Sequence, residues 1–325
     1  MYIIYNESTN PAFNLALEEY LLTRQAGEFI LLWRNARAVI IGRNQNALEE
    51  VDLDYARAHN ISVNRRISGG GAVFHDLGNI NYTVIKDQGK DDFGGYAEFT
   101  GPVIAFLKEL GVEAKLSGRN DLTVDGMKIS GNAQASKNGR IMHHGTLLYN
   151  VDVGDLAGVL RPNQAKISSK GIKSVRSRVT NLVDHLPEKM DTLEFLQRLW
   201  DFYLRSRPDV EERRLTPEEI AAVNQLVEEK YGTWEWNFGR SPAYNLQKDQ
   251  RFDFGLVDVR LSVAGGVIQE VKIYGDFFGM EEITELEQRL TGIPHRREAI
   301  AEALAGVDLG RYIHGISQEQ FLLLF

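Results

Sequence analysis

The chain has 325 residues, of which 43% are hydrophobic and 25% charged, as expected for a soluble globular protein of one or two domains. Its net charge of −8 argues against general nucleic-acid binding, which needs a basic face. Because the chain contains no cysteine, disulfides, cysteine metal sites and a cysteine nucleophile are excluded. The first residues do not resemble a signal peptide, and the apolar runs are too short to span a bilayer. We therefore expect a cytoplasmic protein that binds neither nucleic acid nor membrane.

The first part of the chain predicts one helix and then a series of short strands. Asn10 can cap a helix in which Pro11 suits the first turn and apolar residues recur at helical spacing. The runs that predict strands are Phe29–Trp33, Ala38–Ile41, Val63–Arg66, Ala72–His75 and Asn79–Ile85. Further helices are expected at Asp52–His59 and Gly95–Leu110.

The stretch from Leu122 to Val151 predicts a meander of three strands. Asp125-Gly126 and Asn138-Gly139 are the dipeptides most typical of tight hairpin turns. The segments that predict helices after this meander are Asp152–Leu160, Thr192–Ser206 and Thr216–Lys230.

The last 75 residues show a pattern of their own. Two alternating strands, Arg251–Ser262 and Val267–Tyr274, are joined across Ala264-Gly265-Gly266, and helices are expected at Glu281–Leu290, Arg296–Ala303 and Gln318–Leu324. We place a linker at Asn245–Gln250, which divides the chain into a catalytic domain, residues 1–245, and a small accessory domain, residues 251–325. The expected fold class is α+β, a mixed sheet with helices plus a small α+β appendage.

The segment Arg65–Asp76 (RRISGGGAVFHD) joins two predicted strands. Three consecutive glycines, Gly69, Gly70 and Gly71, let the backbone approach a ligand and direct amide donors at it. Arg66, two residues before Ser68, offers a planar fork for a phosphate or carboxylate. The segment matches neither a Walker loop nor the Gly-x-Gly-x-x-Gly pattern. We interpret it as a ligand-binding loop of another type, against the simpler alternative of a tight connection.

A second polar cluster comprises Ser117–Asp121 and Asp125–Ala133. If the turn at Asp125-Gly126 forms, Lys128 and Ser130 point to the same face of a strand. The Arg-Asn-Asp entry and the Ser-Gly-Asn-Ala exit suit a polar site better than a bare sheet surface, although a lone strand lysine is usually solvated.

Two further features are of interest. His143 and His144 are adjacent on a predicted strand and so face opposite ways, which makes joint metal chelation difficult and favours one histidine in a pocket. Between Asp155 and Asp184 there are six cations and no acidic residue. They are Arg161, Lys166, Lys170, Lys173, Arg176 and Arg178. We interpret this basic stretch as a site for phosphate capture or for docking of an acidic protein, a solvated linker being the alternative.

In this order, the segments resemble those of lipoate–protein ligases of the bacterial two-domain type. The matching runs are RRISGGGAVFHDLGN (residues 65–79), GRNDL (118–122), KISGNA (128–133), HHGTLL (143–148), KGI and SVRSRVTNL (170–182, with Lys173 inserted) and WEWNFG (234–239). The C-terminal stretch matches in position and length more than in motif. The resemblance implies a class II aminoacyl-tRNA-synthetase-like core, shared with biotin ligases, and an accessory domain.

The resemblance also implies roles for individual residues. It makes Arg66, Gly71, Ala72, Val73 and Phe74 contacts of an acyl-adenylate. His75 and Asn79 follow in the same loop and are expected in the pocket, together with Ser68, Gly69, Gly70, Ser130 and His144. Lys128 becomes the catalytic lysine between the lipoate carboxylate and the α-phosphate, and Lys170 to Val179, with Lys170 and Lys173, becomes a loop over the nucleotide. Asp121 holds either a purine amino group or Mg²⁺, and no metal ligand is assigned.

The implied reaction uses ATP and Mg²⁺ to convert lipoate to lipoyl-AMP, which a lysine of an apo lipoyl domain then attacks. The expected partners are 2-oxoacid dehydrogenase acyltransferase subunits and the glycine-cleavage H protein, with the ligase itself a monomer. The strands Phe29–Trp33 and Ala38–Ile41 would enclose the apolar acyl tail. An ATP-independent lipoyl or octanoyl transferase and a non-catalytic lipoate sensor remain alternatives. Biotin ligation is disfavoured, since the glycine segment lacks a Gly-Arg-Gly-Arg pattern.

Overall fold

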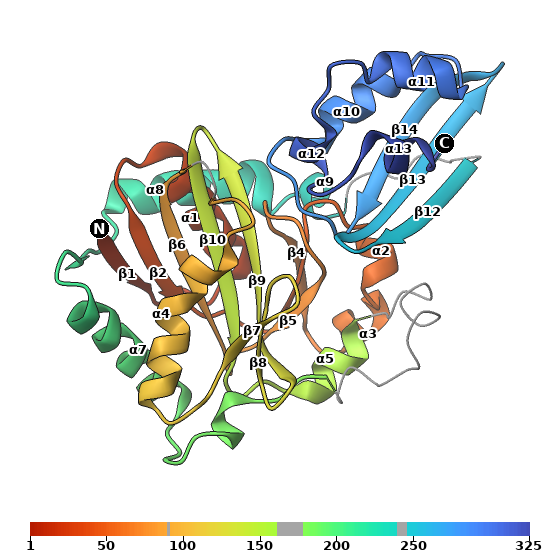
Figure 1. Ribbon diagram of the computed structural model, residues 1–325. Coiled ribbons are helices and arrows are strands. Elements are labelled where there is room, and N and C mark those ends of the chain that lie inside the picture. Colours follow the sequence, from red (N-terminus) through yellow and green to blue (C-terminus); the bar gives the residue numbers. More distant parts are fainter. Residues whose placement is uncertain (90–91, 161–177, 239–245) are drawn as a thin grey trace.

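The largest element of the fold is an eight-stranded mixed sheet (Figure 1). The computed structural model describes residues 1–89, 92–160, 178–238 and 246–325. Across the sheet the strands are β11 (Glu211–Glu212), β1 (Tyr2–Asn6), β2 (Phe29–Trp33), β6 (Asn79–Asp87), β10 (Arg140–Leu148), β9 (Met127–Lys137), β8 (Asp121–Val124) and β7 (Lys115–Ser117). Strand β1 is parallel to both of its neighbours, whereas the other pairs are antiparallel.

Both faces of this sheet are covered by helices, which explains the uninterrupted apolar run of β2. Ile30 and Leu32 pack toward α4 (Tyr96–Glu109) and α7 (Thr192–Ser206). The alternate residues Phe29, Leu31 and Trp33 pack toward α1 (Pro11–Arg24) and α8 (Pro217–Leu226). Because side chains alternate between the faces of a strand, a strand buried on both sides reads as continuously hydrophobic.

Local signals in the sequence account for several of these elements. The side chain of Asn10 accepts hydrogen bonds from the backbone N–H groups of Ala12 and Phe13, and so caps α1 as predicted. Both residues of the Asp125-Gly126 and Asn138-Gly139 turns have positive φ, which confirms the two predicted hairpins. Helix α7 has the predicted bounds, whereas the expected helix Thr216–Lys230 is α8 followed by a π-helical turn at Val227–Tyr231.

A second, three-stranded sheet holds the glycine segment. Its central strand β3 (Ala38–Ile41) is parallel to β4 (Ser62–Arg65) and antiparallel to β5 (Val73–His75). The glycine segment is the connection from β4 to β5. The short helices α2 (Ala47–Glu50), α3 (Leu53–Ala58) and α5 (Val153–Val159) share a hydrophobic core with this sheet. The helical turns at Leu182–Asp184 and α9 (Trp234–Asn237) complete the first part of the chain.

The C-terminal domain has its own sheet and its own core (Figure 1). The sheet consists of β12 (Leu246–Phe252), β13 (Gly255–Ala264) and β14 (Val267–Gly275), all antiparallel. Its helices are α10 (Ile283–Leu290), α11 (Arg297–Ala303), α12 (Leu309–Tyr312) and α13 (Gln318–Leu322).

Two predictions for this region are wrong. The single strand expected at Arg251–Ser262 is the end of β12, a turn and β13. From Leu246 onward, the expected linker is part of β12. The residues of this strand are mostly polar and exposed, so the sequence pattern did not indicate a strand, and pairing with β13 holds it in place.

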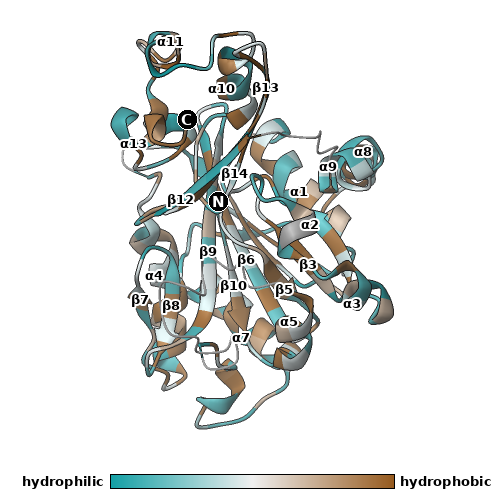
Figure 2. Cartoon of the chain, turned by 90° about the vertical axis from the view of Figure 1, so that its right-hand side faces the viewer, coloured by the Kyte–Doolittle hydropathy of each residue, from teal (hydrophilic) through white to brown (hydrophobic). Residues whose placement is uncertain are grey.

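The C-terminal domain packs against the first part of the chain, beside the glycine segment (Figure 2). The Gly275 N–H donates to the carbonyl of Asn44 over 2.7 Å, and the Arg43 guanidinium bonds to the carbonyls of Gly279 and Glu281. No helix in the part of the chain that the structure describes is long and apolar enough to span a bilayer.

Candidate active site

A cavity of about 110 Å³ opens between the glycine segment and strands β9 and β10. Its apolar wall is formed by Leu15, Trp33, Ile40 and Val73. Positive charge comes from Arg66 and Lys128. Of the two strands expected to enclose an apolar tail, Phe29–Trp33 contributes Trp33 to the cavity lining and Ala38–Ile41 contributes Ile40. A cavity with apolar walls and a few convergent polar groups is the usual form of a small-molecule site.

The predicted site residues divide into two groups. Those that line the cavity are Arg66, Gly70, Gly71, Ala72, Val73, His75, Lys128 and His144. Those that lie outside its lining are Ser68, Gly69, Phe74, Asn79, Asp121 and Ser130. Lys170 and Lys173 lie outside the residues that the structure describes.

The glycines serve close packing as well as any ligand. A side chain on Gly69 would meet the carbonyl oxygen of Phe277 at 2.3 Å, and Gly70 has φ +92°. The Gly70 N–H donates to that same carbonyl over 3.3 Å. Of these three glycines, only Gly71 has open space where a Cβ would lie. Two of the three glycines are therefore required where the C-terminal domain touches the loop, a reason that the sequence did not reveal.

Arg66 is buried and organises the loop in which it lies. Its Nη2 donates to the carbonyls of Gly69 and Gly71, both over 2.8 Å, and its Nη1 donates to the carbonyl of Ile40 over 2.9 Å. Burial lowers the pKa of Arg66 to about 10, and the negative charge of Glu18 opposes that shift. The guanidinium thus stays charged at neutral pH. Its donors bond to the backbone of the loop, so Arg66 shapes the loop and is not simply a free donor group for a phosphate or carboxylate.

Lys128 lies on the cavity wall beside a carboxylate. Its Nζ is 2.7 Å from Oδ1 of Asp121 on β8. Gly131 makes room for this side chain, since a Cβ there would meet Nζ at 2.9 Å. The backbone of Lys128 pairs with the end of the basic stretch, because its N–H donates to Arg178 and its carbonyl accepts from Thr180.

Ser130 and Phe74 correct the sequence prediction. A β-bulge between Leu122 and Thr123 interrupts the alternation along β9, so Lys128 lines the cavity while Ser130 is completely buried and accepts a hydrogen bond from Asn132. On β5, Phe74 points into the core beneath the small sheet, whereas its neighbours Val73 and His75 line the cavity.

Asn79 is a related case. It is completely buried, and its amide donates to Oδ1 of Asn81 over 2.9 Å. Asn81, two residues on, lines the cavity instead. The prediction for Asn79 therefore holds only in the sense that it supports a lining residue.

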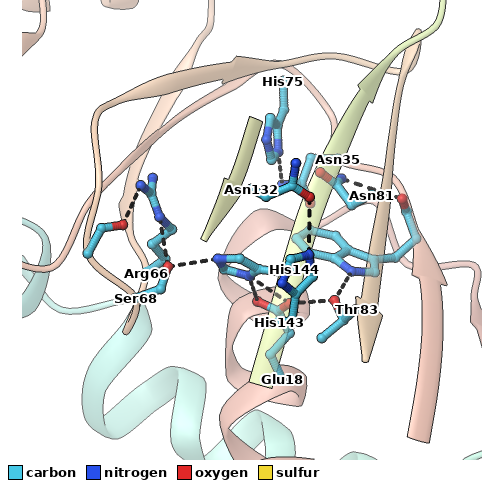
Figure 3. Close-up of polar contacts among 12 residues, drawn as sticks. Glu18, Asn35, Arg66, Ser68, His75, Asn81, Thr83, Asn132, His143 and His144 are labelled. Carbon is cyan, nitrogen blue, oxygen red and sulfur yellow. Dashed lines mark hydrogen bonds and ion pairs between the residues drawn. The ribbon is translucent and has the colours of Figure 1, made fainter. Parts of the chain in front are cut away.

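The three histidines of these motifs have different surroundings (Figure 3). His144 lines the cavity, while His143 is stacked on Phe99 with ring centroids 4.8 Å apart. The two neighbours therefore face opposite ways, as predicted, and no metal-ligating cluster of three exists among the described residues. Burial lowers the pKa of His143 well below its usual range and that of His75 to about 3, so both rings are neutral at pH 7.

Several residues in and behind the cavity lining were not predicted from the sequence. Asn120 and Asn132 line the cavity and bond to each other through side-chain amides and backbone carbonyls. Both lie inside motifs that we had identified, so their position in those motifs was the available signal. Glu18 is completely buried on α1 and contacts His144, and nothing in the helical pattern distinguished it from a solvated acid.

Comparison with known proteins decides the family. Residues 10–203 match the lipoyl protein ligase A/B catalytic domain, and residues 241–325 match the bacterial lipoate protein ligase C-terminus. The chain belongs to the lipoate–protein ligase family. It is 44% identical to lipoate-protein ligase LplJ of Bacillus subtilis and 42% identical to lipoate–protein ligase 1 of Staphylococcus aureus. In both cases the match covers 99% of each chain.

Solved structures of this family confirm the fold. LipL1 of P. falciparum in complex with lipoate superposes with a TM-score of 0.77 at 25% identity, over 99% of this chain and 96% of that one. A lipoate-protein ligase A bound with ATP superposes with a TM-score of 0.63 at 28% identity. This match covers 73% of this chain and 98% of that one. The predicted α+β, class II synthetase-like core with a C-terminal domain is therefore confirmed, as is the ligase class.

Proposed function

We propose that the chain activates lipoate with ATP to form lipoyl-AMP and then transfers the lipoyl group to a lysine of an apo lipoyl domain. The observation that carries this is a single cavity in which apolar wall from Trp33 and Ile40 adjoins the charges of Arg66 and Lys128. An eight-carbon acid needs such an apolar recess, and its carboxylate needs cations where it meets the nucleotide.

In the first step a lipoate carboxylate oxygen attacks the α-phosphorus of ATP, forming a P–O bond and expelling pyrophosphate. Negative charge builds on the phosphoryl oxygens, and a preorganised ammonium stabilises that charge. Lys128 is the catalytic residue for this step, because it lines the cavity as a cation that Asp121 holds in place. Arg66 contributes through the loop that it shapes and through its buried charge.

In the second step the ε-amine of the carrier lysine attacks the acyl carbon of lipoyl-AMP. An amide bond forms, AMP leaves, and the amine loses a proton. The reaction passes directly from adenylate to amine, so it needs no nucleophile of the protein. This agrees with a chain that contains no cysteine.

Magnesium would reach the site with ATP. Mg²⁺ in nucleotide sites is held by substrate phosphates with one or two carboxylates. Asp121, beside Lys128, is a carboxylate that would supply one protein ligand, while the phosphates of ATP would supply others. When bound, Mg²⁺ would neutralise phosphate charge.

The proposed carriers are 2-oxoacid dehydrogenase acyltransferase subunits and the glycine-cleavage H protein, in the cytoplasm, with the ligase acting as a monomer. An archaeal bipartite lipoate protein ligase of Thermoplasma acidophilum, studied with its E2 lipoyl domain, supports carriers of this type at 30% identity and a TM-score of 0.66. It covers 75% of this chain, and this chain covers 98% of it.

The deciding experiment is intact-mass measurement of an apo lipoyl domain incubated with the chain, lipoate and Mg·ATP. A mass gain of one lipoyl group that requires ATP supports the proposal. A gain without ATP would identify a transferase that moves acyl groups between carriers. No gain, together with tight lipoate binding, would identify a sensor.

A further inference from the structure

A completely buried carboxylate, that of Glu18, lies behind the cavity. Glu18 is on α1 and is 1% exposed. Buried acids are rare unless they are paired, because an isolated charge is costly to remove from water. Among the described residues, Glu18 bonds to His144 and to Thr83, which lead in different directions (Figure 3).

The first branch runs from Glu18 to Arg66. Nδ1 of His144 is 2.9 Å from Oε1 of Glu18, and its Nε2 is 2.7 Å from Oγ of Ser68. The Nε–H of Arg66 donates to that same Oγ over 3.0 Å. Ser68 is completely buried, and Nε2 is the only acceptor for its proton in the described part of the chain. The chain of bonds therefore has one direction, from Arg66 to Ser68 to His144 to Glu18, with the proton of His144 on Nδ1.

The second branch runs from Glu18 to Trp33. The indole Nε1–H of Trp33 donates to Oγ1 of Thr83 over 3.0 Å. The hydroxyl of Thr83 then donates to Oε1 of Glu18 over 2.6 Å. Both branches therefore end on one carboxylate, and their outer members, Trp33 and Arg66, both line the cavity.

Electrostatics supports this arrangement. Arg66 has a buried guanidinium whose donors go to backbone carbonyls and to Ser68, with no carboxylate in direct contact among the described residues. Burial lowers its pKa, and Glu18 is the acid that raises it again. A buried cation without direct partner depends on the nearest buried anion to remain charged.

We propose that Glu18 is a positioning residue that orients Arg66 through His144 and Ser68, and Trp33 through Thr83, for lipoate activation. The proposal rests on the proposed function. It assigns the Arg66 branch to the chemical step, where charge develops on the phosphoryl group. It assigns the Trp33 branch to acyl binding, where the shape of the apolar wall matters.

Ser68, His144 and Glu18 are also hydrogen-bonded in the order of a nucleophilic triad. In that reading Ser68 would be the nucleophile, His144 the base and Glu18 the orienting acid. Two observations favour positioning instead. Ser68 is completely buried and lies outside the cavity lining, so it cannot reach an acyl carbon. Its hydroxyl oxygen already accepts from Arg66.

The kinetic test separates the two branches in the full-length enzyme. Ser68→Ala should lower kcat for lipoate-dependent pyrophosphate exchange, and Thr83→Val should raise the KM for lipoate while kcat changes little. Glu18→Gln, which keeps the shape of the side chain, should have both effects, each of about tenfold or more, by analogy with the loss of outer partners that orient metal ligands. In the Ser68→Ala background, Glu18→Gln should lower kcat by less than about twofold further.

The matched control is Glu19→Gln. Glu19 is the next residue on α1, is also buried, and pairs with Lys230 and Tyr231 away from the cavity. This variant should lose stability without changing kcat or KM. Equal kinetic losses in Glu18→Gln and Glu19→Gln would show that Glu18 supports only the fold, and fully additive losses in the Glu18–Ser68 pair would overturn the first branch.

A measurement on the resting protein does not depend on activity. Long-range proton–nitrogen NMR of histidine-labelled enzyme should show His144 neutral with its proton on Nδ1, and Glu18→Leu should abolish that preference. A proton on Nε2 in the wild type would overturn the relay even if the chain proved not to be a ligase. Stoichiometric labelling of Ser68 by a fluorophosphonate would replace positioning with nucleophilic catalysis.

Discussion

Nζ of Lys128 lies 2.7 Å from Oδ1 of Asp121, and Gly131 leaves the space in which that ammonium sits. The lysine that we propose as catalytic is therefore already held by a neighbouring carboxylate before any substrate arrives. A charge that is fixed in advance costs no reorganisation when the phosphoryl group becomes more negative.

Lys128→Ala should lower the rate of lipoyl-AMP formation by about two to three orders of magnitude, the usual effect of removing one preorganised donor. The side chain is about a third exposed, so the melting temperature should change little. Lipoate-dependent pyrophosphate release measures the rate. A rate near that of the wild type would remove Lys128 from the mechanism.

Gly131→Ala should displace the ammonium of Lys128, because the new Cβ would lie 2.9 Å from Nζ. We expect a loss of about tenfold in adenylation, less than in Lys128→Ala, since a flexible side chain can move aside. Gly101→Ala is the matched control. It lies in helix α4 with open space around it, and should stabilise the fold by about 1 kcal/mol with no kinetic effect. Unchanged adenylation in Gly131→Ala would show that the space beside Lys128 is not needed.

Acid should destabilise the fold through its buried histidines. Burial lowers the pKa of His75 to about 3, below its usual 6.5, so between these values the unfolded chain binds a proton that the folded chain does not. The stability that comes from neutral His75 is thus fully present above about pH 6.5 and is lost as the pH falls toward 3. At pH 5 the loss is about 2 kcal/mol.

Urea unfolding between pH 5 and 7.5 measures this effect, with His75→Gln as the comparison. His143 contributes in the same direction, because burial also lowers its pKa. The variant should show a smaller dependence of unfolding free energy on pH. An identical dependence in both proteins would contradict the assignment to His75.

Phe278→Ala tests the contact between the two domains. The ring of Phe278 packs on Gly70 and also lies under the guanidinium of Arg119. The Cζ atom of Arg119 is 4.4 Å from the centroid of this ring. We expect the variant to slow lipoyl-AMP formation while sparing transfer from preformed lipoyl-AMP, because a docked domain excludes water from a reactive anhydride. Leu323→Ala, at an exposed site of the same domain, is the control. Equal slowing of both half-reactions would argue against a specific role in activation.

Lys170 and Lys173 lie in the basic stretch outside the described residues, and replacing both by Glu should weaken nucleotide retention or carrier docking. Salt screens charge interactions in water over about 8–10 Å, so the advantage of the wild type over the variant should shrink as the salt concentration rises. The rate of each half-reaction, measured for both proteins from low to high ionic strength, tests this dependence on salt. Unchanged kinetics in both would indicate a solvated linker.

Much of the fold followed from the sequence, because its determinants are local. The cap at Asn10 and the turns at Asp125-Gly126 and Asn138-Gly139 depend only on neighbouring backbone. The cavity residues of the glycine segment and Lys128 were predicted from motifs, through a family resemblance rather than through geometry.

What the sequence could not determine depends on residues far apart in the chain. Strand β12 resembles a charged linker because its side chains meet solvent, and only the pairing of its backbone edge with β13 makes it a strand. The bulge that separates Lys128 from Ser130 arises from pairing with β8, and the need for Gly69 arises from Phe277 in another domain. Glu18 looks like any helical acid until α1 packs against β10 and brings it to His144. Burial and partnership are set by packing across the whole molecule, so only the tertiary structure decided which polar groups serve the site.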